Sequence, residues 1–450
     1  MKQYVAVFLK RCVRQYVRRT QPYLIGVTGS VGKTSCRMII AQTLQLLLPD
    51  LRVATSSKNF NTEIGLPLAI LGIETMPTSP LGIARMCCIA FGRGIFGGSR
   101  ADIQVLEYGI DGPGDMERLL GIATPHVSFF TALDLVHAHQ LMSRDMILAE
   151  KSKLLLAAKE IVFYPIHLAD EMRSYIQQIS VDTLSYAISD EQNDAADSGW
   201  TDRWVVLHDD TPHARFLLRQ GSEELRPVIT NLLGKEEAGY IAVSIELAMI
   251  VARRFAVRLA EERLQDVLEY QLQPWRYTVF SGKWGSVLID SSYNAAPKSM
   301  HAVLHNAVAL RSALYPSFDL VCVLGEMREL GAFTEEAHRA LAHEIAPIAD
   351  EIYLVWESMR LYCMDELKNI WFTAHRVHRF ASSQELGTCL AEELQHREHR
   401  SVVVFKGSQN TIFMEEAVKP LLKHADDIAL LARHDAQRMK KKQEYFSSVA

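Results

Sequence analysis

Apolar residues near the N-terminus recur every three or four positions, which predicts an amphipathic helix over residues 1–20 that Pro22 ends. The apolar stripe consists of Val5, Phe8, Leu9, Cys12, Val13, Tyr16 and Val17. The basic residues fall largely outside the stripe, at Lys2, Lys10, Arg11, Arg14, Arg18 and Arg19. Such a helix could make a weak contact with a membrane surface, or it could dock on its own domain. The stripe is that of an ordinary core-facing helix, which favours docking.

From residue 23 onward, apolar runs of strand length alternate with helical stretches. A strand, a glycine-rich turn and a helix follow one another directly, and further apolar runs lie at 53–55, 103–107 and 127–131. This alternation predicts a mostly parallel sheet covered by helices. Between residues 161 and 230, short strand-like runs at 161–164, 204–207 and 214–218 are separated by polar turns, which predicts a small β-rich subregion.

A second alternating pattern occupies the C-terminal part of the chain, after a long predicted helix over 238–255. Apolar runs at 286–289, 320–324, 352–355 and 402–405 resemble buried strands with helices between them. The sequence therefore predicts an α/β protein with a P-loop-type central domain and a C-terminal Rossmann-like domain. We expect the amphipathic helix at 1–22, the central domain at 23–275 and the C-terminal domain at 276–450.

Composition narrows the class of protein. The 450 residues include 48% apolar and 22% charged residues and carry a net charge of −5, which is typical of globular protein and gives no overall basic field for nucleic acid. No secretory signal and no uncharged apolar window of about 18 residues occurs. The seven cysteines form no C-x-x-C pair, which indicates a reducing compartment and argues against a zinc site. We expect a cytoplasmic protein.

The strongest local signal is the segment G-V-T-G-S-V-G-K-T at residues 26–34, between an apolar strand and a predicted helix. Glycines in such a turn let backbone N–H groups surround phosphate oxygens, and the helix N-terminus adds a favourable dipole. We expect Lys33 to contact nucleotide phosphates and the Thr34 hydroxyl to hold Mg²⁺. The predicted nucleotide-binding residues of this loop are Gly29, Ser30, Val31, Gly32, Lys33, Thr34 and Ser35.

Further metal-ligand candidates follow two neighbouring strands. Glu107 ends the run at 103–107, and His137 and His139 come shortly after the run at 127–131. The carboxyl ends of parallel strands meet at one edge of a sheet, so these residues are expected near the phosphate loop. A strand-end carboxylate there would serve as a second Mg²⁺ ligand, and a histidine could serve as another.

Several longer motifs resemble those of the Mur ligase family, the ATP-dependent amide-bond ligases of peptidoglycan assembly. They include the loop at 28–34, N-F-N-T-E-I-G-L-P at 59–67, A-E-K-S-K-L-L at 149–155, D-S-S-Y-N-A-A-P at 290–297, L-G-E-M-R-E-L-G at 324–331, and K-G-S at 406–408 with M-E-E at 414–416. The similarity is strongest to the branch that adds D-alanyl-D-alanine. Several independent matches in the same order are hard to obtain by chance.

This resemblance implies a reaction and a set of roles. The enzyme would activate the carboxylate of a UDP-muramoyl-tripeptide with ATP, as an acyl phosphate, and then join it to D-alanyl-D-alanine. Thr34 and Glu107 would hold one Mg²⁺, while His137 and a carbamylated Lys151 would hold a second. Lys33, Lys151, His137 and Glu107 form the expected catalytic set. Arg276 and Asn294 would contact the nucleotide.

The resemblance also suggests substrate contacts. Asn59, Asn61, Glu326 and Leu330 are the expected substrate residues, and the segment 327–331 would bind the incoming dipeptide. These substrates are small molecules, and we expect a monomer.

The sequence departs from the family in ways that keep alternatives open. Family members normally begin with a further domain that binds uridine diphosphate, whereas only about 22 residues precede the first strand here, and Ser291 and Ala296 replace an Asp and an Asn of the signature. One alternative is a related ATP-dependent amino-acid ligase, similar to poly-γ-glutamate synthases, with a substrate that lacks UDP. Another is a nucleotide-binding scaffold without ligase activity.

Overall fold

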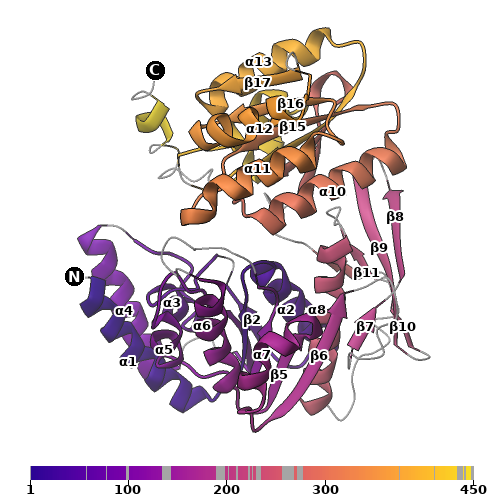
Figure 1. The fold of residues 1–450 in the computed structure, drawn as a ribbon. Coiled ribbons are helices and arrows are strands. Elements are labelled where there is room, and N and C mark those ends of the chain that lie inside the picture. Colours follow the sequence, from indigo (N-terminus) through magenta and orange to yellow (C-terminus); the bar gives the residue numbers. More distant parts are fainter. Residues whose placement is uncertain are drawn as a thin grey trace.

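The computed structural model shows two α/β units next to each other, one built on a parallel sheet and the other on a mostly parallel sheet (Figure 1). The structure describes residues 2–56, 58–77, 79–97, 101–133, 143–188, 198–200, 202–208, 211–220, 223–225, 227–229, 235–255, 268–270, 277–373, 376–409, 411–432, 439 and 442–446. None of the helices in these ranges combines the length and the apolar character that crossing a bilayer requires.

The first sheet has seven strands in the order β2-β3-β1-β4-β5-β6-β7, and all of its neighbouring strands are parallel. The strands are β1 (Tyr23–Thr28), β2 (Val53–Thr55), β3 (Ile103–Glu107), β4 (Val127–Phe130), β5 (Ile161–Pro165), β6 (Asp182–Ile188) and β7 (Ser198–Trp200). The central strands are buried on both faces, which explains their nearly continuous apolar sequences.

Helices cover both faces of this sheet. On one face, α2 (Lys33–Leu47) and α8 (Lys235–Phe255) pack on strand residues such as Ile25 and Phe129. On the other face, neighbouring strand residues such as Leu24 and Phe130 point the opposite way, as the two-residue period of a strand requires. The helices on this second face are α1 (Lys2–Thr20), α3 (Gly65–Ile70), α4 (Pro80–Phe96), α5 (Asp115–Leu120), α6 (Arg144–Leu156) and α7 (Ala169–Ile176).

The N-terminal helix α1 docks on its own domain through the predicted stripe. Leu9, Cys12, Val13 and Tyr16 are buried, and α1 packs against α4 and α3. The docking interpretation is therefore confirmed for the apolar stripe.

The prediction for residues 161–164 is wrong in one respect. These residues do not belong to a separate β-rich subregion but form β5, in the middle of the parallel sheet. Their unbroken apolar run is typical of a strand that is covered on both faces. The smaller sheet begins later and contains β8 (Asp202–His208), β9 (Thr211–Gln220), β10 (Glu223–Leu225), β11 (Pro227–Ile229) and β12 (Leu268–Tyr270).

The C-terminal sheet has six strands in the order β13-β14-β18-β15-β16-β17, and only the β13–β14 pair is antiparallel among them. The strands are β13 (Thr278–Ser281), β14 (Val287–Ser291), β15 (Asp319–Gly325), β16 (Glu351–Val355), β17 (Val377–Phe380) and β18 (Ser401–Lys406). The helices around this sheet are α10 (Pro297–Leu314), α11 (Thr334–Ile345), α12 (Asp365–Asn369), α13 (Ser383–His396) and α14 (Glu415–Val418).

This second α/β unit agrees with the predicted fold class. The predicted crossing near 273–276 lies outside the described residues, so the domain limits at 22, 275 and 450 stay predictions.

Candidate functional site

The glycine-rich loop joins the end of β1 to the start of α2, in the strand–loop–helix context that the motif requires. Gly29 and Gly32 have φ values of 143° and 84°, in the region that favours glycine. A Cβ atom on Gly29 would lie 2.1 Å from Oγ1 of Thr131. The N–H of Ser30 donates to the carbonyl oxygen of Ala132 at 2.7 Å, which ties the loop to the segment after β4. The start of α2 therefore forms a pre-shaped anion site.

Lys33 folds back over this loop. Its Nζ atom donates to the carbonyl oxygens of Gly29 at 2.7 Å and Ser30 at 3.1 Å. These two acceptors hold the ammonium group beside the backbone N–H groups of the loop. An anionic phosphate placed here would meet the ammonium and the helix dipole together.

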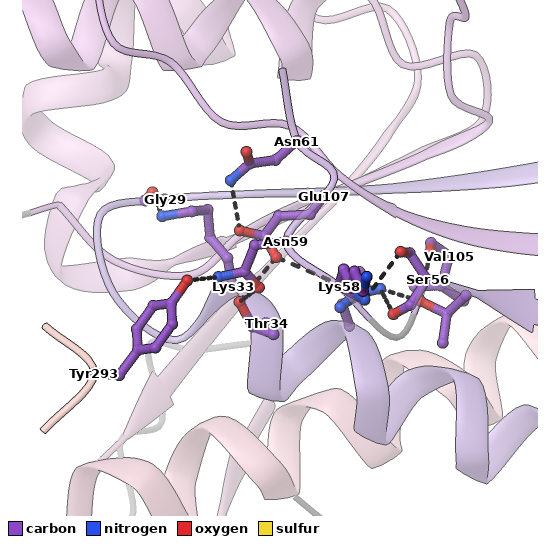
Figure 2. Close-up of polar contacts among 12 residues, drawn as sticks. Gly29, Lys33, Thr34, Ser56, Lys58, Asn59, Asn61, Val105, Glu107 and Tyr293 are labelled. Atoms are coloured by element: carbon purple, nitrogen blue, oxygen red, sulfur yellow. Dashed lines mark hydrogen bonds and ion pairs between the residues drawn. The ribbon is translucent and has the colours of Figure 1, made fainter. Parts of the chain in front are cut away.

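A polar cluster lies between the loop and the end of β3 (Figure 2). The Thr34 hydroxyl donates to Oε2 of Glu107 at 2.9 Å, and Nδ2 of Asn61 donates to Oε1 of the same carboxylate at 3.1 Å. Oδ1 of Asn59 lies 3.3 Å from the Thr34 hydroxyl oxygen. Glu107 and Thr34 are both buried. A hydroxyl oxygen and a carboxylate side by side are donors that suit Mg²⁺.

Lys151 projects from α6 into the same site. It is only 2% exposed, and its Nζ donates to the carbonyl oxygen of Gly29 at 2.8 Å. Burial, together with the positive charge of Lys33, lowers the pKa of Lys151 well below its ordinary value, although Glu107 and Asp111 act in the opposite direction. The group therefore has the environment that a neutral amine requires.

Lys153, two residues away on α6, lies in a different environment. Its Nζ donates to Oε2 of Glu150 at 2.7 Å and to Oε1 of Glu117 at 2.9 Å, and its side chain is 32% exposed. Partial burial lowers the pKa of Lys153, but the two carboxylates outweigh that effect and raise it. The structure thus separates one buried lysine at the loop from one solvated lysine in ion pairs.

The loop after β14 and the end of β18 complete the site from the C-terminal domain. The hydroxyl oxygen of Tyr293 accepts a hydrogen bond from Nδ2 of Asn59 at 2.6 Å, so the two domains touch at this point (Figure 2). Lys406 is buried and donates to the carbonyl oxygen of Asn294 at 2.8 Å and to Oγ of Ser291 at 3.2 Å. Oδ1 of Asn294 accepts from the N–H of Gln409 at 3.2 Å.

These groups line one cavity of about 420 Å³ between the two domains. Its lining comprises Ser30, Val31, Gly32, Lys33, Thr34, Ser35, Asn59, Asn61, Glu107, Gly109, Ile110, Asp111, Lys151, Tyr277, Ser291, Tyr293, Asn294, Ala296, Ser299, Val303, Lys406 and Gln409. The structure therefore brings together the predicted loop residues from Ser30 onward with Glu107, Lys151, Asn59, Asn61 and Asn294. Gly29 supports the cavity through its carbonyl oxygen.

Two models of protein families match the chain. The model described as the Mur ligase middle domain matches residues 27–239, and the model described as the Mur ligase, glutamate ligase domain matches residues 275–409. Together they account for most of the chain, in the order of its two sheets. The chain belongs to the Mur ligase family.

Relatives of this Mur ligase include UDP-N-acetylmuramoyl-tripeptide–D-alanyl-D-alanine ligase from Bacillus subtilis (strain 168), which is 24% identical over 421 residues. That alignment covers 92% of this chain and 79% of the relative. The crystal structure of MurF from Acinetobacter baumannii has a similar fold, with a TM-score of 0.69 and 20% identity over 91% of this chain and 79% of that one.

A second solved structure, MurF from Thermotoga maritima in complex with ADP, gives a TM-score of 0.66 at 20% identity. The similarity covers 92% of this chain and 83% of that one.

Two predicted substrate residues of this Mur ligase do not line the cavity. The Leu330 side chain packs in the core of the C-terminal domain. Oε1 of Glu326 accepts from Nε of Arg328 at 2.6 Å, and the guanidinium of Arg328 stacks over Trp356 at 4.5 Å. Their substrate roles stay predictions.

Two further predicted residues, His137 and Arg276, lie outside the described residues, as does His139. Their expected roles at the metal and the nucleotide stay predictions.

Sequence reasoning missed Arg37 of this Mur ligase. Arg37 lies one helical turn after Lys33 on α2, is 1% exposed, and places Nε 3.7 Å from Oε2 of Glu107. Its Nη1 donates to Oγ1 of Thr55 at 2.7 Å and to the carbonyl oxygen of Ser56. A lone arginine within the apolar run C-R-M-I-I of α2 was the available signal. The guanidinium places a buried positive charge beside the Glu107 carboxylate.

Proposed function

We propose that this protein is an ATP-dependent carboxylate–amine ligase that joins D-alanyl-D-alanine to a UDP-muramoyl-tripeptide. The observation that carries the proposal is the meeting of Lys33, Thr34, Glu107 and Lys151 in one cavity between two domains. The similarity to named ligases of this type along 92% of the chain supports the choice of substrates. These substrates are made in the cytoplasm, where we expect the enzyme to work as a monomer.

The reaction needs activation because a carboxylate is a poor electrophile. In the proposed mechanism, an oxygen of the substrate carboxylate attacks the γ-phosphorus of ATP, and the bond to the β,γ-bridging oxygen breaks, which gives an acyl phosphate and ADP. The amine of the dipeptide then attacks the acyl carbon, loses a proton, and displaces inorganic phosphate. The loop N–H groups and Lys33 hold the phosphates and offset the charge that develops on the transferring group.

The donor set of the site suits Mg²⁺. The adjacent Thr34 hydroxyl and Glu107 carboxylate would be its oxygen ligands, with Asn61 donating to the carboxylate and the Arg37 guanidinium beside it. Bound Mg²⁺ would neutralise charge on the phosphate oxygens. A carbamate on Lys151 would add an anionic oxygen donor, and its formation requires a neutral amine, which the lowered pKa of Lys151 favours. His137 is the proposed partner of Lys151 at a second ion.

The C-terminal domain supplies the remaining contacts in this proposal. Asn294 would contact the nucleotide, with Arg276 from the segment between the domains. Asn59 of the central domain donates a hydrogen bond to Tyr293 of the C-terminal domain. Closure of the two domains would bring Tyr293 and Asn294 nearer to the phosphate loop. It would also exclude water from the acyl phosphate. Asn59 and Asn61 would orient the carboxylate substrate, while the segment that contains Glu326 and Leu330 would position the dipeptide.

The test is phosphate release from ATP and Mg²⁺ with UDP-muramoyl-tripeptide, with and without D-alanyl-D-alanine, together with mass spectrometry of the products. We expect release that needs both substrates and a pentapeptide product. Release that needs a different acid and amine would replace this proposal with another peptide ligation. Tight nucleotide binding without turnover of any acid and amine pair would favour a nucleotide-binding scaffold without ligase activity.

A matched pair of variants tests the role of Lys151. We expect Lys151→Ala to lower kcat at least 100-fold and added short carboxylic acids to restore part of it, because a free carboxylate can occupy the place of the carbamate. Lys153→Ala is the control, since Lys153 lies outside the cavity in ion pairs. Equal activity of Lys151→Ala and the unaltered enzyme would remove Lys151 from the mechanism.

A further inference from the structure

Helix α4 buries Met86 and packs Ile83 on the core, but it presents four other large apolar side chains to solvent. Its buried residues are Met86, Ala90 and Gly94, two of which are small. A Cβ atom on Gly94 would lie 2.9 Å from the carbonyl oxygen of Cys12, so α4 packs closely on α1 through these small residues. An ordinary surface helix turns its large apolar residues toward the core, so the four exposed residues of α4 are unusual.

We call the solvent side of this helix the α4 face and define it by Leu81, Ile89, Phe91 and Phe96. Leu81 and Phe96 are 82% and 79% exposed, and Ile89 and Phe91 are also exposed. At about 3.6 residues per turn, the four residues fall within roughly half of the helix circumference, opposite the buried residues. Exposed large apolar side chains gathered on one side of a helix are typical of an interaction surface.

Helix α1 lies beside α4 at the outer edge of the central domain (Figure 1). Its own exposed side begins with Tyr4 and Val7 and continues with Arg11 and Arg18. The apolar surface of α4 therefore adjoins a side of α1 that is apolar at its start and basic further along.

The charge of the two helices is one-sided. Their 36 residues include eight lysines and arginines and no aspartate or glutamate. The whole chain carries a net charge of −5, so the remainder of the chain carries −13. A negative surface would repel most of this protein and attract the α1–α4 side, which orients the molecule before contact.

We propose that the α4 face and the adjoining basic side of α1 dock on a membrane surface that contains anionic lipid. The apolar side chains of α4 enter the boundary between headgroups and acyl chains, and Arg11, Arg18 and Arg19 meet the phosphate groups. Helices that lie in a membrane surface combine an apolar face with basic residues in this way. Arg85 lies within the α4 face and can extend its guanidinium to the headgroups while its stem stays apolar.

The test is co-sedimentation of the purified chain with vesicles of phosphatidylglycerol and phosphatidylcholine, compared with phosphatidylcholine alone. We expect binding to the anionic vesicles that weakens as the salt concentration rises, because the headgroup contacts are screened. Leu81→Ser/Phe96→Ser should reduce the partition coefficient at least tenfold. Arg11→Gln/Arg18→Gln/Arg19→Gln should reduce it by about 100-fold at low salt.

Two matched controls come from other parts of the surface. Trp371→Ser removes a side chain that is 92% exposed on the C-terminal domain, and Arg173→Gln removes an exposed charge on α7. Both should leave vesicle binding unchanged. All four variants lie outside the proposed active site, so phosphate release in solution should be unaffected, and a circular dichroism melt checks that each folds.

Three results would overturn the proposal. The unaltered chain could stay in the supernatant with anionic vesicles. Leu81→Ser/Phe96→Ser could bind as tightly as the unaltered chain. Finally, analytical ultracentrifugation could detect a dimer that this double variant abolishes, which would assign the α4 face to contact between two copies of the chain.

Discussion

Lys33 and Lys151 donate hydrogen bonds to one and the same acceptor, the carbonyl oxygen of Gly29, at 2.7 and 2.8 Å. The two amines come from different helices, α2 and α6, and meet at the start of the phosphate loop. Burial makes it costly to charge Lys151, and the positive charge of Lys33 on the same oxygen adds to that cost. Together these effects lower the pKa of Lys151 well below its ordinary value, which favours the neutral amine that carbamate formation requires.

This relationship predicts that carbamylation of Lys151 depends on Lys33. Replacing Lys33 with Met should lower the carbamate occupancy of Lys151 several-fold. The substitution removes a charge that lowers the pKa of Lys151, and it also removes a cation beside the carbamate anion. Carbon-13 NMR of protein equilibrated with labelled bicarbonate measures the occupancy directly, without reference to activity.

The control for this measurement is Lys153→Met. It should leave the carbamate signal intact, because the Lys153 ammonium forms ion pairs with Glu117 and Glu150 outside the cavity. A carbamate signal that disappears in Lys153→Met and persists in Lys151→Met would show that Lys153, and not Lys151, carries the carbamate.

The lowered pKa of Lys151 also predicts a pH dependence of stability. Between its lowered pKa in the folded state and about 10.4 in the unfolded chain, the unfolded state binds a proton that the folded state does not. The free energy of unfolding contributed by this group therefore rises with pH across that window. Lys151→Met removes the cost of burying the amine, so we expect it to be more stable than the unaltered protein at neutral pH. The difference should shrink as the pH approaches 10.4.

Urea unfolding at several pH values in buffer free of carbon dioxide measures this effect. Lys153→Met should show the opposite sign, because ion pairs raise the pKa of Lys153 and its contribution is lost only at higher pH. A Lys151→Met variant that is less stable than the unaltered protein at neutral pH would mean that the amine is charged and paired in the folded state.

Much of the site was predictable because its signals are local. The loop glycines, Lys33 and Thr34 follow from residue spacing between a strand and a helix. Glu107 follows from its place at the end of a strand, since the carboxyl ends of parallel strands share one edge. Lys151 was predicted only through resemblance to a family, because neither its spacing nor its helix distinguishes it from Lys153.

The rest depends on tertiary packing that a sequence does not display. The apolar run at 161–164 has the same composition in a small sheet and in the middle of a large one. Its place follows only from its pairing with β4 and β6. In the sequence, Arg37 resembles any helical arginine. Its role follows only from its contact with Glu107, which lies 70 residues later in the chain, at the end of a strand. The exposure of Phe96 could not be predicted either, because a pattern of apolar residues does not show which face of a helix packs on the protein.

The pair formed by Arg37 and Glu107 predicts a large effect on stability. Both side chains are buried, at 1% and 4% exposure, so Glu107→Gln leaves a buried guanidinium without its nearest carboxylate. We expect a loss of about 3 kcal/mol in the free energy of unfolding, and the double variant Arg37→Met/Glu107→Gln should recover at least half of it. Glu117→Gln, an exposed control, should cost less than about 1 kcal/mol. Equal losses in the single and double variants would mean that the pair does not couple.

The last prediction concerns the backbone of the phosphate loop. Gly29 has a φ of 143°, and a Cβ atom there would lie 2.1 Å from Oγ1 of Thr131 and 3.0 Å from the backbone nitrogen of Ala132. Gly29→Ala must therefore move the loop away from the segment after β4, which displaces the carbonyl oxygen that both lysines share. We expect a loss of about 1–3 kcal/mol in stability and at least a 100-fold fall in kcat/KM.

Gly92→Ala is the matched control, because a Cβ atom at Gly92 meets nothing within 4 Å and the residue lies inside α4. That substitution should leave turnover unchanged and raise stability by about 0.5–1 kcal/mol, as alanine does in a helix interior. Thermal unfolding and phosphate release on both variants separate the two effects. A Gly29→Ala enzyme with full activity would mean that the carbonyl oxygen of Gly29 does not position Lys33 and Lys151 for catalysis.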